Sequence, residues 1–94
     1  MAERSIHGFS TDEIKNLLVS DIPVDRMSAM GYLLEDDQPL DDFVDLIVPL
    51  KQSETLGVFG MTEGDIAALL LAAKEVEPYN GTNQIVLHQL ELIS

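Results

Sequence analysis

Residues 62–76 carry the sequence TEGDIAALLLAAKEV, which is the strongest helix signal in the chain. Thr62 and Asp65 have the spacing of a helix start, in which each side chain can accept a hydrogen bond from the other residue's backbone N–H. The three leucines at 69–71 point in directions about 100° apart, so a single contact face cannot bury all of them. We therefore expect this helix to lie at the centre of the fold or at an interface between subunits.

Three shorter helices are predicted before this one. Residues 10–20 begin with a capping-box pattern. Residues 23–34 begin at a proline, which suits a first helical turn, and are weakened by Gly31. Residues 39–48 also begin at a proline, and Pro49 must kink or end that helix. Four further side chains are assigned to the core of this helical domain: Met27, Met30, Tyr32 and Met61.

Two segments have patterns that leave their structure open. Residues 52–60 fit either a short strand or a loop pinned by apolar contacts. Residues 84–93 fit a strand or a helix, and we expect the strand. An alternative α+β class joins a strand at 54–60, the helix at 62–76 and this C-terminal strand into a small right-handed β-α-β unit. The strand pattern at the C-terminus places four residues on one face: Val86, His88, Leu90 and Leu92.

The expected fold class is mainly α, a compact bundle of four short helices with a C-terminal β-strand as its minor β content. A length of 94 residues with 46% hydrophobic residues suits one domain, residues 1–94. We divide this domain into an N-terminal arm at 1–9, a helical core at 10–76, and a turn with the C-terminal strand at 77–94.

The charge balance excludes several classes of function. Seventeen Asp and Glu residues against five Lys and Arg residues give a formal net charge of -12, which opposes direct binding to DNA or RNA. The absence of cysteine excludes disulfides, a thiolate nucleophile and Cys-based metal sites. No secretory signal or apolar run of membrane-spanning length is visible, so we expect a cytoplasmic protein that does not bind a membrane.

An acidic segment, residues 35–45, is the most informative feature for function. Asp41 and Asp42 would lie in the first turn of a helix, where the helix dipole favours anions. This explanation does not cover Glu35 and Asp36, which follow a helix, or Asp45, which would share a helical face with other carboxylates. Six residues of this segment are predicted to bind a partner: Glu35, Asp36, Asp37, Asp41, Asp42 and Asp45. The alternatives are a solvated acidic surface with no partner and, less favoured, a site for a divalent cation.

No pattern in the chain predicts catalysis, a cofactor or a metal site. An EF-hand loop starting at Glu35 would have Leu40 in place of its glycine and Leu46 in place of its final glutamate. His7 and His88 have no metal-ligand spacing, and the glycines near residue 60 are not followed by a phosphate-loop lysine. We therefore expect a protein that is not an enzyme and holds neither cofactor nor metal.

These observations favour a small acidic, non-catalytic interaction protein that binds a basic surface of a partner protein. Such a protein could act as an inhibitor or antitoxin-like regulator that occludes a nucleic-acid site. The alternative is a structural or assembly subunit that forms a homo-oligomer through the helix at 62–76 and the C-terminal tail. In that case the carboxylates keep the assembly in solution.

Overall fold

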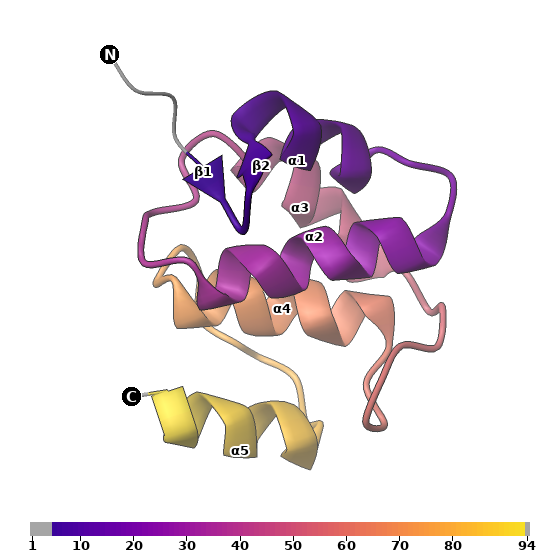
Figure 1. The fold of residues 1–94 in the computed structure, drawn as a ribbon. Coiled ribbons are helices and arrows are strands. Elements are labelled where there is room, and N and C mark those ends of the chain that lie inside the picture. Colours follow the sequence, from indigo (N-terminus) through magenta and orange to yellow (C-terminus); the bar gives the residue numbers. More distant parts are fainter. Residues whose placement is uncertain (1–4, 94) are drawn as a thin grey trace.

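The computed structural model describes residues 5–93, and these residues form a mainly helical fold (Figure 1). Its elements in chain order are β1 (Ser5–Ile6), β2 (Phe9–Ser10), α1 (Thr11–Leu18), α2 (Pro23–Glu35), α3 (Val44–Ile47), the 3₁₀ helix η1 (Val48–Gln52), α4 (Glu63–Ala73) and α5 (Gln84–Ile93). The mainly α class is therefore confirmed. The described residues form five α-helices where the sequence patterns indicated four.

Helix α4 lies at the centre of the fold. Ile66 and the three leucines at 69–71 are buried, and α4 packs against α2, α5 and η1. Figure 1 shows α2, α4 and α5 running in the same direction, with α1 and the β1–β2 hairpin packed beyond α2. Because helices from this chain cover α4 on several sides, its apolar surface is buried without a second subunit.

A buried ion pair joins the beginnings of α2 and α4. The Arg26 guanidinium donates to both carboxylate oxygens of Glu63 at 2.6 and 3.0 Å, and the Ser53 hydroxyl donates to the same carboxylate at 2.7 Å. The Glu63 side chain is fully buried. The hydrogen bonds from Arg26 hold the pKa of Glu63 below its ordinary value although burial opposes ionisation, and the same pairing raises the pKa of Arg26.

The start of α4 also packs closely against the backbone after η1. Thr62 and Asp65 form the predicted capping box, with both side chain to backbone hydrogen bonds at 3.1 Å. A Cβ atom at Gly64 would lie 2.6 Å from the carbonyl oxygen of Lys51 and 2.7 Å from that of Ser53. The glycine therefore permits a helix-to-backbone contact that a larger residue would push apart.

The strand predicted at residues 84–93 is wrong, because these residues form α5. Val86 is buried and Leu90 is half-buried against the core while the residue midway between them is exposed, which fits a helix and does not fit a strand. His88 and Leu92, which the strand pattern placed on the buried face, are exposed. Asn83 begins the helix by accepting a hydrogen bond from the backbone N–H of Ile85 with its side-chain oxygen, at 2.9 Å.

The alternative β-α-β unit is wrong for the same reason, and its first strand is also missing. Within the described chain, residues 54–60 form a loop whose β pairing is a single antiparallel bridge between Leu56 and Thr62. The helix predicted at 39–48 is shorter, because α3 begins at Val44 after a turn and passes into η1. That change places Asp41 and Asp42 in the preceding turn and Asp45 in α3.

The predicted N-terminal arm contains a short hairpin. Its residues 1–4, and residue 94 at the other end of the expected domain, lie outside the described part of the chain. Antiparallel pairing places Ile6 opposite Phe9, and both turn residues, His7 and Gly8, have positive φ, as a tight two-residue hairpin turn requires. Ile6 is fully buried, so this arm contributes to the hydrophobic core.

Helix α4 ends three residues before its predicted limit at Val76. The backbone N–H groups of Glu75 and Val76 donate to the carbonyl oxygens of Ala72 and Leu71 at 3.1 and 2.9 Å. This pattern is a Schellman motif, in which glycine usually occupies the left-handed position. Here Glu75 occupies it with φ 60°, so the end of α4 was not evident from residue type.

We expect Glu63→Gln to destabilise the fold by about 3 kcal/mol near neutral pH, because Arg26 would lose a charged partner in a largely buried position. The pKa of Glu63 is lower in the folded state than in the unfolded state, where it is about 4.5. The ion pair therefore stabilises the fold fully above a pH of about 4.5, and this stabilisation is lost as the pH falls through the pKa of the folded state. Urea unfolding of the wild type and of Glu63→Gln, at neutral and at acidic pH, measures the free energy of unfolding of each. The difference between wild type and variant should shrink in acid.

Glu77→Gln provides the control for this measurement. It removes the partly exposed partner of Lys51, so it should change the unfolding free energy by less than about 1 kcal/mol. A Glu63→Gln effect as small as this control, or one that stays constant from neutral to acidic pH, contradicts a stabilising role for the buried pair.

We expect Glu75→Gly to stabilise the fold by about 1 kcal/mol, because it relieves a left-handed conformation and removes an anion from a helix C-terminus. Urea unfolding near neutral pH measures the change. Glu75→Gln separates the two causes, since it removes the charge and keeps the strained backbone. Equal stabilisation by both substitutions would show that the backbone conformation contributes nothing.

Candidate functional site

The acidic segment lies between the end of α2 and the body of α3. Glu35 is the last residue of α2, Asp36 and Asp37 follow it, and Asp41 and Asp42 precede α3, which contains Asp45. Among these predicted site residues Asp36 is half-buried and the others are exposed. The segment therefore presents most of its carboxylates to the solvent.

Two cationic or ionisable side chains from distant parts of the sequence contact this segment. Nε2 of His7 lies 3.0 Å from a carboxylate oxygen of Glu35, and the His7 ring stacks on Tyr32 with centroids 5.1 Å apart. Lys74 donates to the backbone carbonyl oxygens of Asp36 and Gln38. Sequence reasoning missed both contacts, because the hairpin and the end of α4 meet the acidic segment only in the folded chain.

The carboxyl-terminal ends of α2, α4 and α5 form a negative edge, defined here by Glu35, Glu75 and Glu91. Figure 1 shows these three ends on the same side of the molecule. Within residues 5–93, none of these three helices carries a basic residue in its last turn, although Lys74 directly follows α4 and His7 contacts Glu35. Each helix dipole places partial negative charge at its C-terminus, so the dipoles add to the carboxylates rather than offsetting them.

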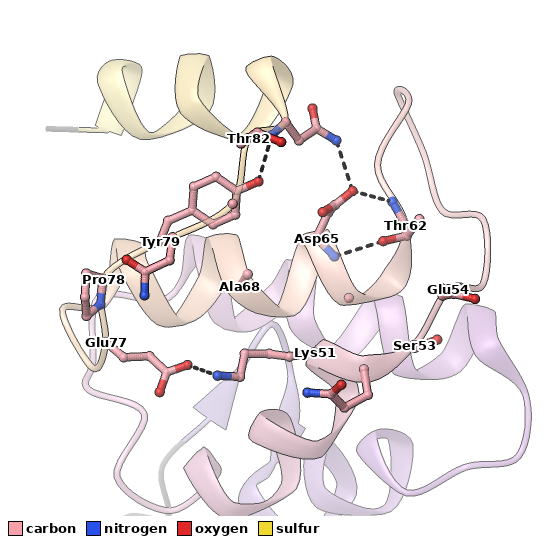
Figure 2. Close-up of a pocket in the computed structure, with 15 residues that line it drawn as sticks. Lys51, Ser53, Glu54, Thr62, Asp65, Ala68, Glu77, Pro78, Tyr79 and Thr82 are labelled. Atoms are coloured by element: carbon pink, nitrogen blue, oxygen red, sulfur yellow. Dashed lines mark hydrogen bonds and ion pairs between the residues drawn. The ribbon is translucent and has the colours of Figure 1, made fainter.

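A polar hollow lies between the end of η1, the first half of α4 and residues 77–83 (Figure 2). Its side chains bind one another: Asp65 accepts from Asn83 at 3.0 Å, the Tyr79 hydroxyl accepts from the backbone N–H of Asn83 at 3.1 Å, and Lys51 pairs with Glu77. These contacts hold the segment before α5 against α4. They give Asp65, Asn83, Tyr79, Lys51 and Glu77 a structural role.

An apolar groove lies on another face, between α2 and α5, with α4 at its base. Its volume is about 370 Å³, and residues from the loop before α4 close one end. Residues that define it are Val24, Gly31, Leu34, Phe59, Leu69 and Ile85. Met27 and Met61, assigned to the core from sequence, also line it; Met61 is buried and Met27 half-buried.

The wall that α2 contributes to the groove has a gap at Ser28 and Gly31, between the larger side chains of Val24, Met27 and Leu34. Ser28 and Gly31 lie one turn apart, and a Cβ atom built at Gly31 would meet nothing within 4 Å. A glycine inside a helix costs about 1 kcal/mol relative to alanine. Packing within the described chain does not account for that cost.

The loop at one end of the groove exposes large apolar side chains. Leu56 and Phe59 are each 85% exposed and Val58 is 53% exposed. Phe59 also has φ 55°, a conformation that is rare for an aromatic residue. The expectation that apolar contacts pin this loop therefore fails for its tip, and the tip is an exposed apolar patch beside the groove.

Residues 5–93 contain no group of three His, Asp or Glu side chains placed to hold a metal ion. None of their helices combines the length and the apolar character needed to cross a membrane.

No family model, curated protein or solved structure matches this chain.

Proposed function

We propose that this protein is a small, non-catalytic interaction protein that uses its acidic segment to bind a basic surface on a partner protein. The observation that carries the proposal is the exposure of Glu35, Asp37, Asp41, Asp42 and Asp45 on a chain with a net charge of -12. A concentration of exposed negative charge attracts a basic surface, increases the rate of encounter and orients the partner.

The distribution of cations supports this proposal. Arg26 is paired with Glu63, Lys51 is paired with Glu77, and Lys74 donates to backbone carbonyl groups. These internal contacts engage three of the five Lys and Arg residues of the chain. Within residues 5–93, the exposed carboxylates outnumber the four Lys and Arg residues.

A protein with this charge distribution would act as an inhibitor or antitoxin-like regulator by covering a basic nucleic-acid site on its partner. The basic side chains of such a site normally contact phosphates, and carboxylates offer them a comparable negative surface. The site would then be closed to nucleic acid as long as the acidic protein stays bound.

We expect the double variant Asp41→Lys, Asp45→Lys to retain about tenfold less partner than wild type, because both side chains are exposed in the acidic segment. Immobilised protein is incubated with extract of the native host at low and high salt, and the retained proteins are identified and quantified by mass spectrometry. Partner retained by the wild type should be released as salt rises, since exposed charge contacts are screened.

The matched control is Asp21→Lys, Glu54→Lys, which makes the same change in net charge at exposed positions before α2 and α4. It should retain the partner, and circular dichroism should show the wild-type helix content for both variants. Equal retention by the acidic-segment variant and the wild type would refute the proposed function.

Self-association is a second candidate function, and α5 is the observation that favours it. The interface expected on the helix at 62–76 is largely covered by other elements, so the C-terminal tail provides the surface for contact between subunits. Helix α5 buries Val86 and leaves four apolar side chains exposed. These side chains are Ile85, Leu87, Leu92 and Ile93.

Self-association through α5 predicts a sedimentation coefficient that rises with protein concentration. The double variant Leu87→Lys, Leu92→Lys should then sediment as a monomer, because it places charge in the proposed interface. A wild-type protein that sediments as a monomer at every concentration would exclude this second function while leaving the acidic-segment proposal intact.

A further inference from the structure

We propose that the apolar groove between α2 and α5 is the docking site for an amphipathic α-helix of a partner protein, with apolar residues on one face and lysine or arginine on the other. This inference rests on the proposed function, because it assigns a shape and a binding position to the basic partner. The groove, the bare surface of α2 and the negative edge together lead to it.

The first observation is the missing side-chain volume on α2. Ser28 and Gly31 face the groove, and a Cβ atom at Gly31 would meet nothing within 4 Å. Gly31 lies within a regular helix and has no positive φ, so neither its backbone conformation nor its internal packing requires glycine. Glycine allows another backbone to approach closely. The gap at Ser28 and Gly31 therefore leaves room for a partner segment that lies along α2.

The second observation is the length and shape of the groove. Along α2 it extends from Val24 to Leu34, which corresponds to about 15 Å at the rise of an α-helix. Three apolar anchors at positions i, i+4 and i+7 of a helix span about 10 Å and fit within that length. Its walls are helical, and the sheet in residues 5–93 is the hairpin at the N-terminus, so the groove offers no strand edge to an extended peptide.

The third observation is the set of apolar groups that an occupant would contact. Phe59 and Val58 stand exposed at one end, and Ile85 lines the groove from α5. Met27 and Met61 are flexible side chains that adjust to the shape of a bound helix. Burial of Phe59 by a partner would remove from water an aromatic ring that is now 85% exposed.

Charge complementarity favours a basic occupant over a second copy of this chain. The groove is lined by uncharged residues and runs along α2 to Leu34, one residue before Glu35 at the negative edge, whose Glu75 and Glu91 line a separate hollow. An occupant antiparallel to α2 would place its positive N-terminal dipole and nearby lysines at that edge. A second copy would add its own net charge of -12, which opposes association.

The test uses three fluorescent synthetic peptides of about 18 residues, long enough for five helical turns. The first is helical, with leucines along one face and lysines on the other. The second has the same composition in scrambled order, and the third replaces every lysine of the first with glutamate. Fluorescence anisotropy measures the affinity of each peptide for the full chain.

Gly31→Leu is the informative variant, since leucine fills the groove and also favours the helix more than glycine does. Asn16→Leu is its matched control, because it adds an apolar side chain at an exposed position of α1 outside the groove. Wild type should bind the first peptide at least about tenfold more tightly than the other two. Gly31→Leu should reduce that affinity about tenfold, and Asn16→Leu should leave it unchanged.

Four results would overturn the docking proposal. These are no binding of the first peptide, equal binding of the scrambled peptide, unchanged affinity in Gly31→Leu, and equal or tighter binding of the glutamate peptide. Dimerisation of the wild type that Gly31→Leu abolishes would also overturn it, because the groove would then receive a second copy.

The acidic-segment variant separates this proposal from the proposed function. If Asp41→Lys, Asp45→Lys loses partner in the extract experiment while Gly31→Leu keeps both the peptide and the partner, the groove proposal fails and the proposed function stands. If Gly31→Leu loses the peptide while Asp41→Lys, Asp45→Lys retains the partner, the groove is a docking site and the acidic segment is not.

Discussion

The fold depends on one constraint, the burial of a helix that is apolar on nearly every side. The leucines at 69–71 and Ile66 cannot be covered by one neighbour, so α2, η1 and α5 must all pack around α4. Burial of large apolar side chains is the main favourable contribution to folding. The positions of the outer helices, and of the surfaces between them, follow from this requirement.

The contacts at the helix ends give this arrangement its direction. Glu63 binds Arg26, and Asp65 binds Asn83, so α2 and α5 both begin near the start of α4. Helices that start together and run in the same direction also end together. Their C-terminal dipoles and Glu35 therefore accumulate at one edge, and the groove between α2 and α5 leads to that edge. The polar contacts at the helix starts thus align the three helices so that their C-terminal ends meet at the negative edge.

Local signals predicted the parts of the fold that neighbouring residues control. The capping boxes at Ser10 and Thr62 are both present, because each needs only side chains three residues apart. The C-terminal tail could not be assigned in this way, since its apolar residues fit two periods and contact with α4 selects the helix. The end of α4 was also missed, because Glu75 occupies a backbone conformation that residue type does not favour.

Composition and spacings within one or two turns were enough to predict the helical class, the two capping boxes, the apolar helix at 62–76 and the acidic segment. The meeting of distant groups depends on the packing of the folded chain: His7 and Lys74 on the acidic segment, Arg26 on Glu63, and α2 beside α5. The groove includes the gap that Ser28 and Gly31 leave on α2. That gap becomes part of a groove only because residues of α4 and α5 pack beside it.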